Sequence, residues 1–199
     1  MINNMTGIIL SGGKNSRMGI NKAFLEIDGV RLIDKILRVF NELFSEIIIV
    51  TNEPLAYTEF ASASIVTDIY KNKGALGGIY SGLFFSSNNY SFVTACDIPF
   101  LNKDLIAYLG KQVKNHDIVV PVASDGFQPL HAVYSKNCLA PIKRNLYADK
   151  LKITDFYKGL RVLTVPEEQL KPFNKDGRLF FNINTPKELE LIIEKEIHK

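Results

Sequence analysis

The sequence predicts a single α/β domain built on a mainly parallel sheet with helices on both faces. Up to residue 122, short apolar runs that are typical of buried strands alternate about four times with segments of helical periodicity. The chain is 199 residues long and has no Gly/Ser-rich linker, internal repeat or break in composition. One domain over residues 1–199 is therefore expected.

The elements of the first half follow one another in that alternation. The apolar run 8–10 ends at a Ser-Gly-Gly turn and is typical of a buried strand. Apolar residues at helical spacing over 30–44 predict an amphipathic helix, and four β-branched residues at 47–50 predict a strand covered on both faces. The same reasoning predicts a short helix at 54–61, strands at 64–67, 91–95 and 117–121, and helices at 76–87 and 102–114, the last with Asn102 as N-cap.

The second half is less regular. We expect a strand at 131–134, a helix at 137–148, a strand at 160–165 and a final helix that opens at Thr185-Pro186. In sheets of this kind, ligands bind outside the carboxyl ends of the strands. The loops to inspect for a site are therefore those after Leu10, Val50, Thr67, Ala95 and Val120.

Composition excludes several other classes of protein. Apolar residues make up 46% of the chain and the net charge is only +3, so a disordered chain is excluded and a nucleic-acid-binding one is not indicated. Two cysteines are too few for a disulfide framework. The N-terminus lacks the pattern of a signal peptide, and no apolar run approaches the roughly 20 residues of a membrane span. These observations predict a cytoplasmic protein with no membrane partner.

The segment Leu10–Lys22 is a glycine-rich loop after the first predicted strand. Gly12 and Gly13 let the backbone approach a ligand and expose N–H groups to an anion, while Arg17 and Lys22 add two cations. A polyphosphate fits that combination, because each phosphate oxygen requires a fixed donor. The segment matches neither a Walker A loop nor the dinucleotide fingerprint. The alternative is a glycine turn with solvated basic residues.

Acidic residues follow two later strands at the same expected edge. Asp68 comes directly after the strand 64–67, and Asp97 lies two residues after the strand 91–95. A carboxylate there can hold the Mg²⁺ that accompanies a triphosphate. The alternative for either residue is a helix N-cap or an Asx-turn. For Asp97 we favour function, because Pro99 would interrupt a helix directly behind it.

Together these segments resemble the MobA family of molybdenum cofactor guanylyltransferases. The matching elements are Leu10-Ser11-Gly12-Gly13, Arg17-Met18-Gly19 with Lys22, Gly74-Ala75-Leu76-Gly77-Gly78, Cys96-Asp97-Ile98-Pro99, Gln128 to Tyr134, and Phe181-Asn182-Ile183-Asn184-Thr185-Pro186. These six segments occur in the family's order from residue 5 to about 190, which makes the resemblance specific although each segment alone is weak.

The resemblance implies a Rossmann-like three-layer domain of the nucleotide-diphospho-sugar transferase type, with a mainly parallel mixed sheet. It implies transfer of GMP from GTP to the phosphate of molybdopterin, with release of pyrophosphate. Leu10, Ser11, Gly12 and Gly13 would contact the nucleotide, Arg17 and Lys22 would neutralise the triphosphate, Asn52 and Asp68 would help hold guanine and ribose, Asp97 would bind Mg²⁺, and Asn182 and Asn184 would lie nearer the molybdopterin.

Ala75 stands where the family usually has Pro, and a second departure from the family pattern matters more. Relatives can carry Asn-x-Asn after the second main strand, whereas this chain has Val50-Thr51-Asn52. A nucleotide contact of the first Asn is therefore not carried over to Val50. Rival functions are a cytidylyltransferase, another nucleotidyltransferase of the same fold that acts on a sugar phosphate or cobinamide, and a nucleotide-binding module without turnover. The Ser-Gly-Gly turn favours guanylyl over cytidylyl transfer, because cytidylyl relatives usually read Ala-Ala-Gly there.

The remaining polar residues give weaker indications. The three histidines are scattered, and none stands at ligand spacing to a Cys or acidic residue that would make a zinc site. His131 could contact substrate, but a structural role is favoured. Cys96 is expected to be a small buried residue. The family also suggests that molybdopterin is handed over by transient contact with molybdopterin-synthesis proteins or molybdoenzymes.

Overall fold

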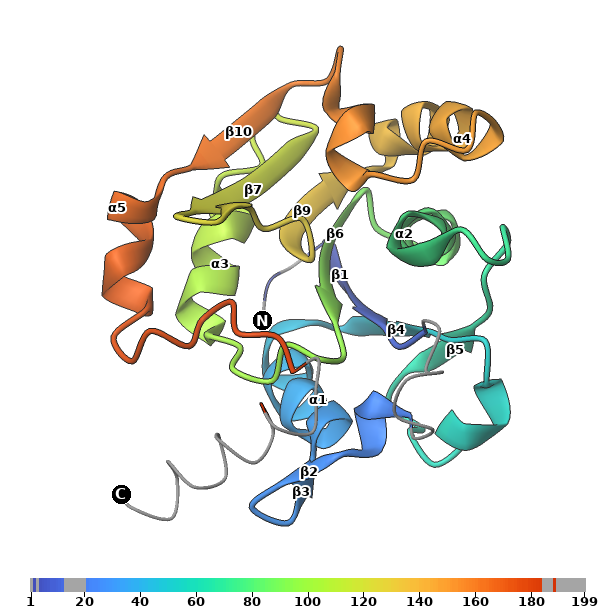
Figure 1. Cartoon of the computed structure of the whole chain (residues 1–199), viewed down its shortest axis with the longest axis vertical. Helices are drawn as coiled ribbons and strands as arrows, with labels where there is room; N and C mark the ends of the chain where they lie inside the picture. The colour runs from blue at the N-terminus through green and yellow to red at the C-terminus, as the bar shows by residue number, and fades with distance from the viewer. Residues whose placement is uncertain (1, 3, 13–20, 184–187, 189–199) are drawn as a thin grey trace.

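A mixed sheet forms the centre of the computed structural model, which describes residues 2, 4–12, 21–183 and 188 (Figure 1). Seven of its described strands lie side by side in the order β10-β7-β9-β6-β1-β4-β5, and β8 pairs with β7 alone. Their bounds are Val162–Val165, Ile118–Ala123, His131–Ser135, Tyr90–Ala95, Met5–Leu10, Glu46–Val50 and Ser64–Val66, with β8 at Gly126–Phe127.

β9 is the one described strand of this row that runs antiparallel to its neighbours, β6 and β7. The other neighbouring pairs are parallel. Only residues 124–130 separate β7 from β9, and a parallel return needs a crossover of a dozen or more residues. The mainly parallel mixed sheet predicted from the sequence is thereby confirmed.

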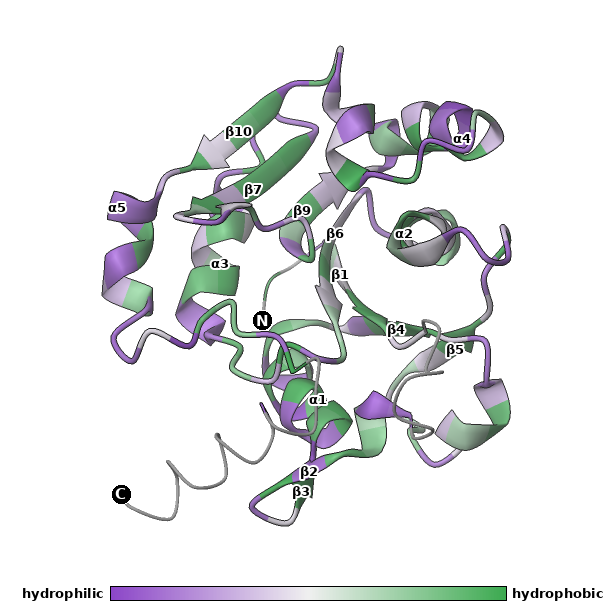
Figure 2. Ribbon diagram, viewed as in Figure 1, coloured by the Kyte–Doolittle hydropathy of each residue, from purple (hydrophilic) through white to green (hydrophobic). Residues whose placement is uncertain are grey.

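Helices cover both faces of the sheet. α1 (Leu32–Leu43), α3 (Lys103–Lys111) and α5 (Glu167–Leu170) pack in one apolar cluster, and α2 (Gly74–Phe85) and α4 (Leu139–Tyr147) pack in another. Neighbouring strand residues belong to opposite clusters, as Ile8 and Ile9 do, because side chains alternate along a strand. Figure 2 shows the strands as predominantly apolar, as expected for a sheet covered on both faces. The three-layer prediction is confirmed.

α2 lies unusually close to β1 because it carries glycines on the face that meets the strand. A Cβ at Gly82 would lie 2.6 Å from the Ile8 side chain, and a Cβ at Gly78 would lie 3.2 Å from that of Leu10. No larger residue fits at Gly82 without displacing Ile8. The close contact fixes the N-terminus of α2 beside the loop that follows β1.

Several element bounds differ from the predictions. The helix expected at 54–61 is a 3₁₀ turn, Pro54–Tyr57, and the helix expected at 137–148 is a 3₁₀ turn, Lys136–Cys138, followed by α4. A short hairpin of β2 (Glu26–Ile27) and β3 (Val30–Arg31) was not predicted. The predicted N-cap of α3 is confirmed, since Asn102 accepts hydrogen bonds from Asp104 N and Leu105 N at 2.9 and 3.0 Å. The final helix expected at Thr185-Pro186 starts outside the described residues.

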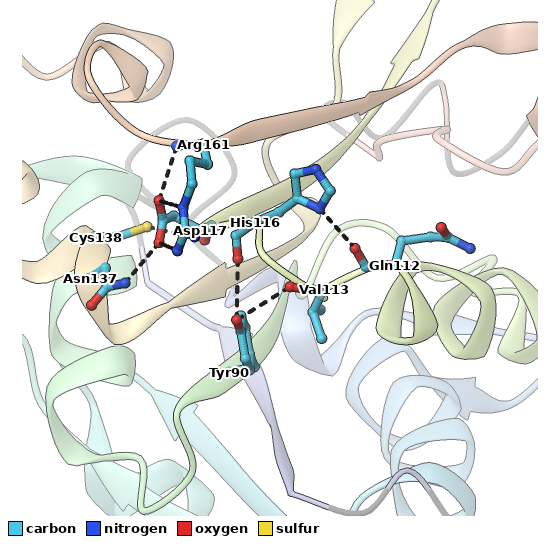
Figure 3. Close-up of polar contacts among 8 residues, drawn as sticks. All are labelled: Tyr90, Gln112, Val113, His116, Asp117, Asn137, Cys138 and Arg161. Atoms are coloured by element: carbon cyan, nitrogen blue, oxygen red, sulfur yellow. Dashed lines mark hydrogen bonds and ion pairs between the residues drawn. The ribbon is translucent and has the colours of Figure 1, made fainter.

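A buried carboxylate joins β7, β10 and the chain before α4 (Figure 3). Asp117 accepts hydrogen bonds from the backbone N, Nε and Nη2 of Arg161 at 3.0, 3.1 and 3.0 Å, and from Asn137 Nδ2 at 2.8 Å. Its own carbonyl accepts from Ser135 N. The hydrogen bonds from Arg161 hold the pKa of Asp117 well below its usual range.

Candidate functional site

Four parallel strands end level with one another at one edge of the sheet. The register pairs Leu10 with Val50 and with Ala95, and Val50 with Val66. The loops after β1, β4, β5 and β6 therefore leave from a common edge, as the sequence predicted for a ligand site. The segment that follows β7, also a candidate, contributes Leu130 to the smaller of the two cavities at this edge.

The larger cavity at this edge has a volume of about 630 Å³. Four of the predicted nucleotide-binding residues line it: Leu10, Gly12, Asn52 and Asp68. The start of α2 contributes another wall, and Val50 contributes an apolar one. A cavity of this size accommodates a ligand as large as a nucleoside.

Asn52 and Asp68 act as a pair on the wall of this cavity. Asn52 Nδ2 donates to Asp68 Oδ2 at 2.9 Å, so the carboxylate bonds a side chain and caps no helix. The other oxygen, Asp68 Oδ1, is buried and has no hydrogen-bond partner among the described residues. Burial raises the pKa of Asp68, and the bond from Asn52 opposes that shift. The arrangement leaves one acceptor available to an N–H or O–H group of a ligand.

The second cavity adjoins the first and has a volume of about 200 Å³. Leu10, Gly12 and Ala75 line both cavities, and Ser11, Lys22 and Asp97 are among the further residues of the smaller one. Lys22 Nζ lies 3.5 Å from Asp97 Oδ2, and each of these two side chains is 23% exposed. A cation and a carboxylate thus face each other beside the glycine loop.

Asn21 and Tyr57 hold Lys22 in this position, and neither residue was predicted from the sequence. Asn21 caps a 3₁₀ turn, Lys22–Phe24, by accepting from Ala23 N at 3.1 Å. Its Nδ2 donates to the Tyr57 hydroxyl at 3.0 Å, and that buried hydroxyl also bonds the Ser11 hydroxyl. The N-cap pattern of Asn followed by a short helical turn was visible in the sequence. The contribution of Tyr57 was not, because it depends on residues far apart in the chain.

Asp97 is positioned by β6 and by the C-terminal part of the chain. The Asp97 carbonyl accepts a hydrogen bond from Ile183 N at 2.9 Å, and Ile183 is buried against Ile27 and Leu32. The neighbour of Ile183 in the chain, Asn182, is exposed and lines neither cavity. Gly13, Arg17 and Asn184, also predicted site residues, lie outside the described residues.

Three further residues line the larger cavity and were not predicted. Lys71 and Asn72 precede α2, and Leu151 comes from the turn after α4. Cys96 lines the smaller cavity, and burial raises the pKa of its thiol to about 11, so the thiol stays protonated and unreactive. Both cysteines are free and buried, and the predicted burial of Cys96 is confirmed.

His131 lies outside both cavities. It is buried between the rings of Phe92 and Phe180, with ring centroids 5.1 and 5.2 Å away. Burial lowers the pKa of His131 to about 3, so the imidazole is neutral at physiological pH. Its environment is that of a core residue.

The donor set at Asp97 fits one kind of metal ion. Among the described residues, no cluster of three or more His, Cys, Asp or Glu side chains could hold a metal. Mg²⁺ is usually bound by one or two carboxylates together with substrate phosphates. A single carboxylate beside a phosphate-sized cavity is therefore consistent with Mg²⁺ that arrives with a nucleotide, and does not suit a structural zinc site.

The fold and this site define a nucleotide-binding α/β protein of the nucleotidyltransferase class. Gly12, the cation of Lys22 and the carboxylate of Asp97 converge at the carboxyl ends of parallel strands, beside a nucleoside-sized cavity. The chain belongs to the MobA-like NTP transferase family, whose domain model matches residues 7–163.

Two relatives match nearly the whole chain. The molybdenum cofactor guanylyltransferase of Desulfosudis oleivorans is 40% identical over 188 residues, which is 94% of this chain and 93% of the relative. The probable molybdenum cofactor guanylyltransferase of Natranaerobius thermophilus is 35% identical over 195 residues, 96% of this chain and 95% of that one.

Solved structures share the architecture. The crystal structure of the molybdopterin-guanine dinucleotide biosynthesis protein A of Archaeoglobus fulgidus superposes with a TM-score of 0.82 at 26% identity, covering 98% of this chain and all of that one. The 2-C-methyl-D-erythritol 4-phosphate cytidylyltransferase of Thermus thermophilus shares the fold with a TM-score of 0.69 at 15% identity, covering 96% of this chain and 98% of that one. None of the described helices has both the length and the apolar character that crossing a membrane requires.

Proposed function

We propose that the protein is a molybdenum cofactor guanylyltransferase, which transfers GMP from GTP to the phosphate of molybdopterin and releases pyrophosphate. Relatives that bear this name match over nearly the whole chain. The observation that carries the proposal is the Lys22–Asp97 pair, 3.5 Å apart, in a phosphate-sized cavity that opens beside a nucleoside-sized one.

The two cavities divide the nucleotide between them. Guanine and ribose occupy the larger cavity, where Asp68 Oδ1 is a free acceptor for a ring N–H or a ribose hydroxyl and Asn52 orients that carboxylate. Leu10 supplies an apolar contact there. The triphosphate lies in the smaller cavity, against Ser11 and Gly12, which line it. The family pattern assigns Gly13 to the same role.

The reaction is an in-line attack by the molybdopterin phosphate on the α-phosphorus of GTP. The attacking group is already an anion, so it needs no general base. The barrier comes from bringing two anions together, and fixed positions with charge neutralisation lower it. Lys22 and Arg17 supply positive charge to the triphosphate. Mg²⁺ held by Asp97 would add charge neutralisation at the phosphates.

Molybdopterin lies on the Asp97 side of the cleft in this proposal. The bond from Ile183 N to the Asp97 carbonyl supports this assignment, because Asn182 directly precedes Ile183. Asn182 is assigned to the molybdopterin side for that reason and by the family pattern, and Asn184 by the family pattern alone. A transient contact with molybdopterin-synthesis proteins or molybdoenzymes in the cytoplasm would deliver and remove this substrate. A cross-linking survey that recovers none of them would contradict that contact.

One assay separates the candidate functions. Purified protein is mixed with molybdopterin, Mg²⁺ and either GTP or CTP, and released pyrophosphate is measured. Guanylyl transfer predicts pyrophosphate with GTP and far less with CTP. The cytidylyltransferase alternative, to which the shared fold of the Thermus protein gives some support, predicts the reverse. Absence of pyrophosphate with both nucleotides, together with measurable GTP binding, would support the non-catalytic module.

A further inference from the structure

A third cavity lies apart from the nucleotide site, between α4 and the 3₁₀ turn Ile153–Tyr157, and has a volume of about 490 Å³. Figure 1 shows α4 beside α2, with which it shares an apolar cluster. The third cavity is lined by Pro141, Arg144, Asn145, Lys150, Asp155, Phe156 and Lys158. None of these residues lines either nucleotide cavity.

The charge of this cavity is strongly positive for its size. Three cations, Arg144, Lys150 and Lys158, face one carboxylate, Asp155, which leaves an excess of two positive charges. Within the described ranges, none of these four groups lies within ion-pair distance of an oppositely charged one. The cations are therefore available to a ligand.

Asn145 adds a buried donor to the cations. Its Nδ2 is inaccessible to solvent and has no hydrogen-bond acceptor in the part of the chain that the structure describes. Buried polar groups are rarely left unpaired, and an unpaired one indicates a water or an ion. An amide, a guanidinium and two ammonium groups all donate, so the matching ligand is an anion with several acceptor oxygens, above all a phosphate.

The end of α4 holds these donors in place. Lys150 N donates to the Asn145 carbonyl at 2.9 Å, and Asp149 N donates to the Leu146 carbonyl at 3.3 Å. Asp149 adopts a left-handed conformation with φ of 56°. This is the Schellman motif, which ties the backbone of Lys150 to that of Asn145. The buried Phe156 forms part of the wall. The site is thus built on a fixed helix end.

The turn 149–151 also reaches the nucleotide site. Leu151 lines the larger nucleotide cavity, while Lys150 lines the third, positively charged cavity, which we call the basic cavity. The Asp149 carboxylate pairs at 2.9 Å with Lys73 Nζ, and Lys73 directly precedes α2. The two cavities therefore share one short turn.

We propose that the basic cavity is a second anion site, which binds a small phosphate-bearing molecule next to the nucleotide site. This site is separate from the catalytic residues and does not rest on the proposed transferase function. Its ligand chemistry is that of a phosphate group, either as the free ion or as a phosphate monoester.

The test is a titration of the ¹⁵N-labelled full chain with inorganic phosphate at constant ionic strength, followed by NMR. We expect saturable shifts of the amides between residues 144 and 158. In the triple variant R144Q/K150Q/K158Q, which changes exposed side chains, the affinity should fall at least about tenfold because charge-assisted donors are lost. The charge-matched control K111Q/K114Q/K171Q also changes three exposed side chains. Its affinity for phosphate should stay within about twofold of that of the unmodified protein, since distant exposed charges are screened.

Titrations with other ligands identify the source of the phosphate, and certain outcomes would contradict the proposal. Tighter binding of glycerol 3-phosphate than of inorganic phosphate would indicate a phosphorylated metabolite, and the reverse a free ion. Shifts confined to residues near Gly12, Lys22 and Asp97, or equal affinities in both triple variants, would overturn the proposal. Stronger binding of a short poly-glutamate peptide at the cavity would overturn it too. If the triple variant does not fold, K158Q alone is measured against K171Q.

Discussion

At the scale of single residues, the proposed chemistry depends most on Asp97. This carboxylate is the acidic group of the smaller cavity, and it faces Lys22 at 3.5 Å. We expect Asp97→Ala and the closer mimic Asp97→Asn to lose at least about a hundredfold in kcat, the range measured when one electrostatic stabiliser is removed. Pyrophosphate release checks the rate, and a thermal unfolding curve checks the fold. A near-normal rate in either folded variant would remove the metal role from Asp97.

Lys22 is the second residue of this pair, and its expected effect is smaller. Lys22→Ala should slow turnover at least about tenfold, which corresponds to about 1.4 kcal/mol of barrier. The reason is that the variant lacks one positive charge that would neutralise the triphosphate. The exposed Lys111 offers a control, since Lys111→Ala removes the same charge far from the cavity. Equal rates in the two variants would contradict a phosphate role for Lys22.

At the scale of elements, the packing of α2 on β1 can be tested with a pair of glycines. Gly82→Ala would place a Cβ 2.6 Å from Ile8, whereas Gly110→Ala in α3 would meet only ordinary contacts at 3.5 Å. We expect Gly82→Ala to lower the free energy of unfolding by about 1–3 kcal/mol through overpacking. Gly110→Ala should leave it unchanged or raise it by up to about 1 kcal/mol, because alanine favours helix.

Urea unfolding of both variants measures this difference. Equal midpoints would show that the contact with Ile8 relaxes without cost. α2 also forms a wall of the nucleotide cavity through Gly74, Ala75 and Gly78. The affinity of the Gly82 variant for GTP is therefore a second measure of any displacement of α2 from β1.

The sequence predicts those features of the elements that depend on local pattern. The β-branched run of β4, the N-cap Asn102 and the placement of Asp68 and Asp97 at strand ends all follow from short-range rules. The hairpin turn at Asp28-Gly29, with φ of 54° and 70°, carried the usual Asp-Gly signal and was missed because its strands are only two residues long.

Other features depend on contacts between distant segments and cannot be read from local pattern. Periodicity does not encode strand direction, so the antiparallel β9 could not be assigned from its residues. Tyr57 bonds Ser11 across 46 positions, and Leu151 reaches a cavity whose other lining residues lie between 10 and 78. Such residues become visible only once the chain is folded.

At the scale of the whole molecule, Asp117 ties together β7, β10 and the segment before α4. Its pKa lies well below the ordinary value because Arg161 and Asn137 donate to the carboxylate. The unfolded chain, with an ordinary pKa of about 3.9, therefore takes up this proton more readily than the folded one. The stability that Asp117 contributes is complete at neutral pH, and it is lost progressively as the pH falls below about 5.

Asp117→Asn isolates this contribution. We expect the free energy of unfolding at pH 7 to fall by about 1–3 kcal/mol, because the donors of Arg161 and Asn137 lose a charged acceptor. The difference from the unmodified protein should shrink as the pH is lowered toward 3. Asp176→Asn is the control, since its pair with Arg178 is partly exposed, with 48% of the Asp176 side chain accessible, and should matter by less than about 1 kcal/mol. Denaturant unfolding from pH 7 to pH 3 measures both. Parallel curves for the Asp117 variant and the unmodified protein would mean that the carboxylate is not the titrating group.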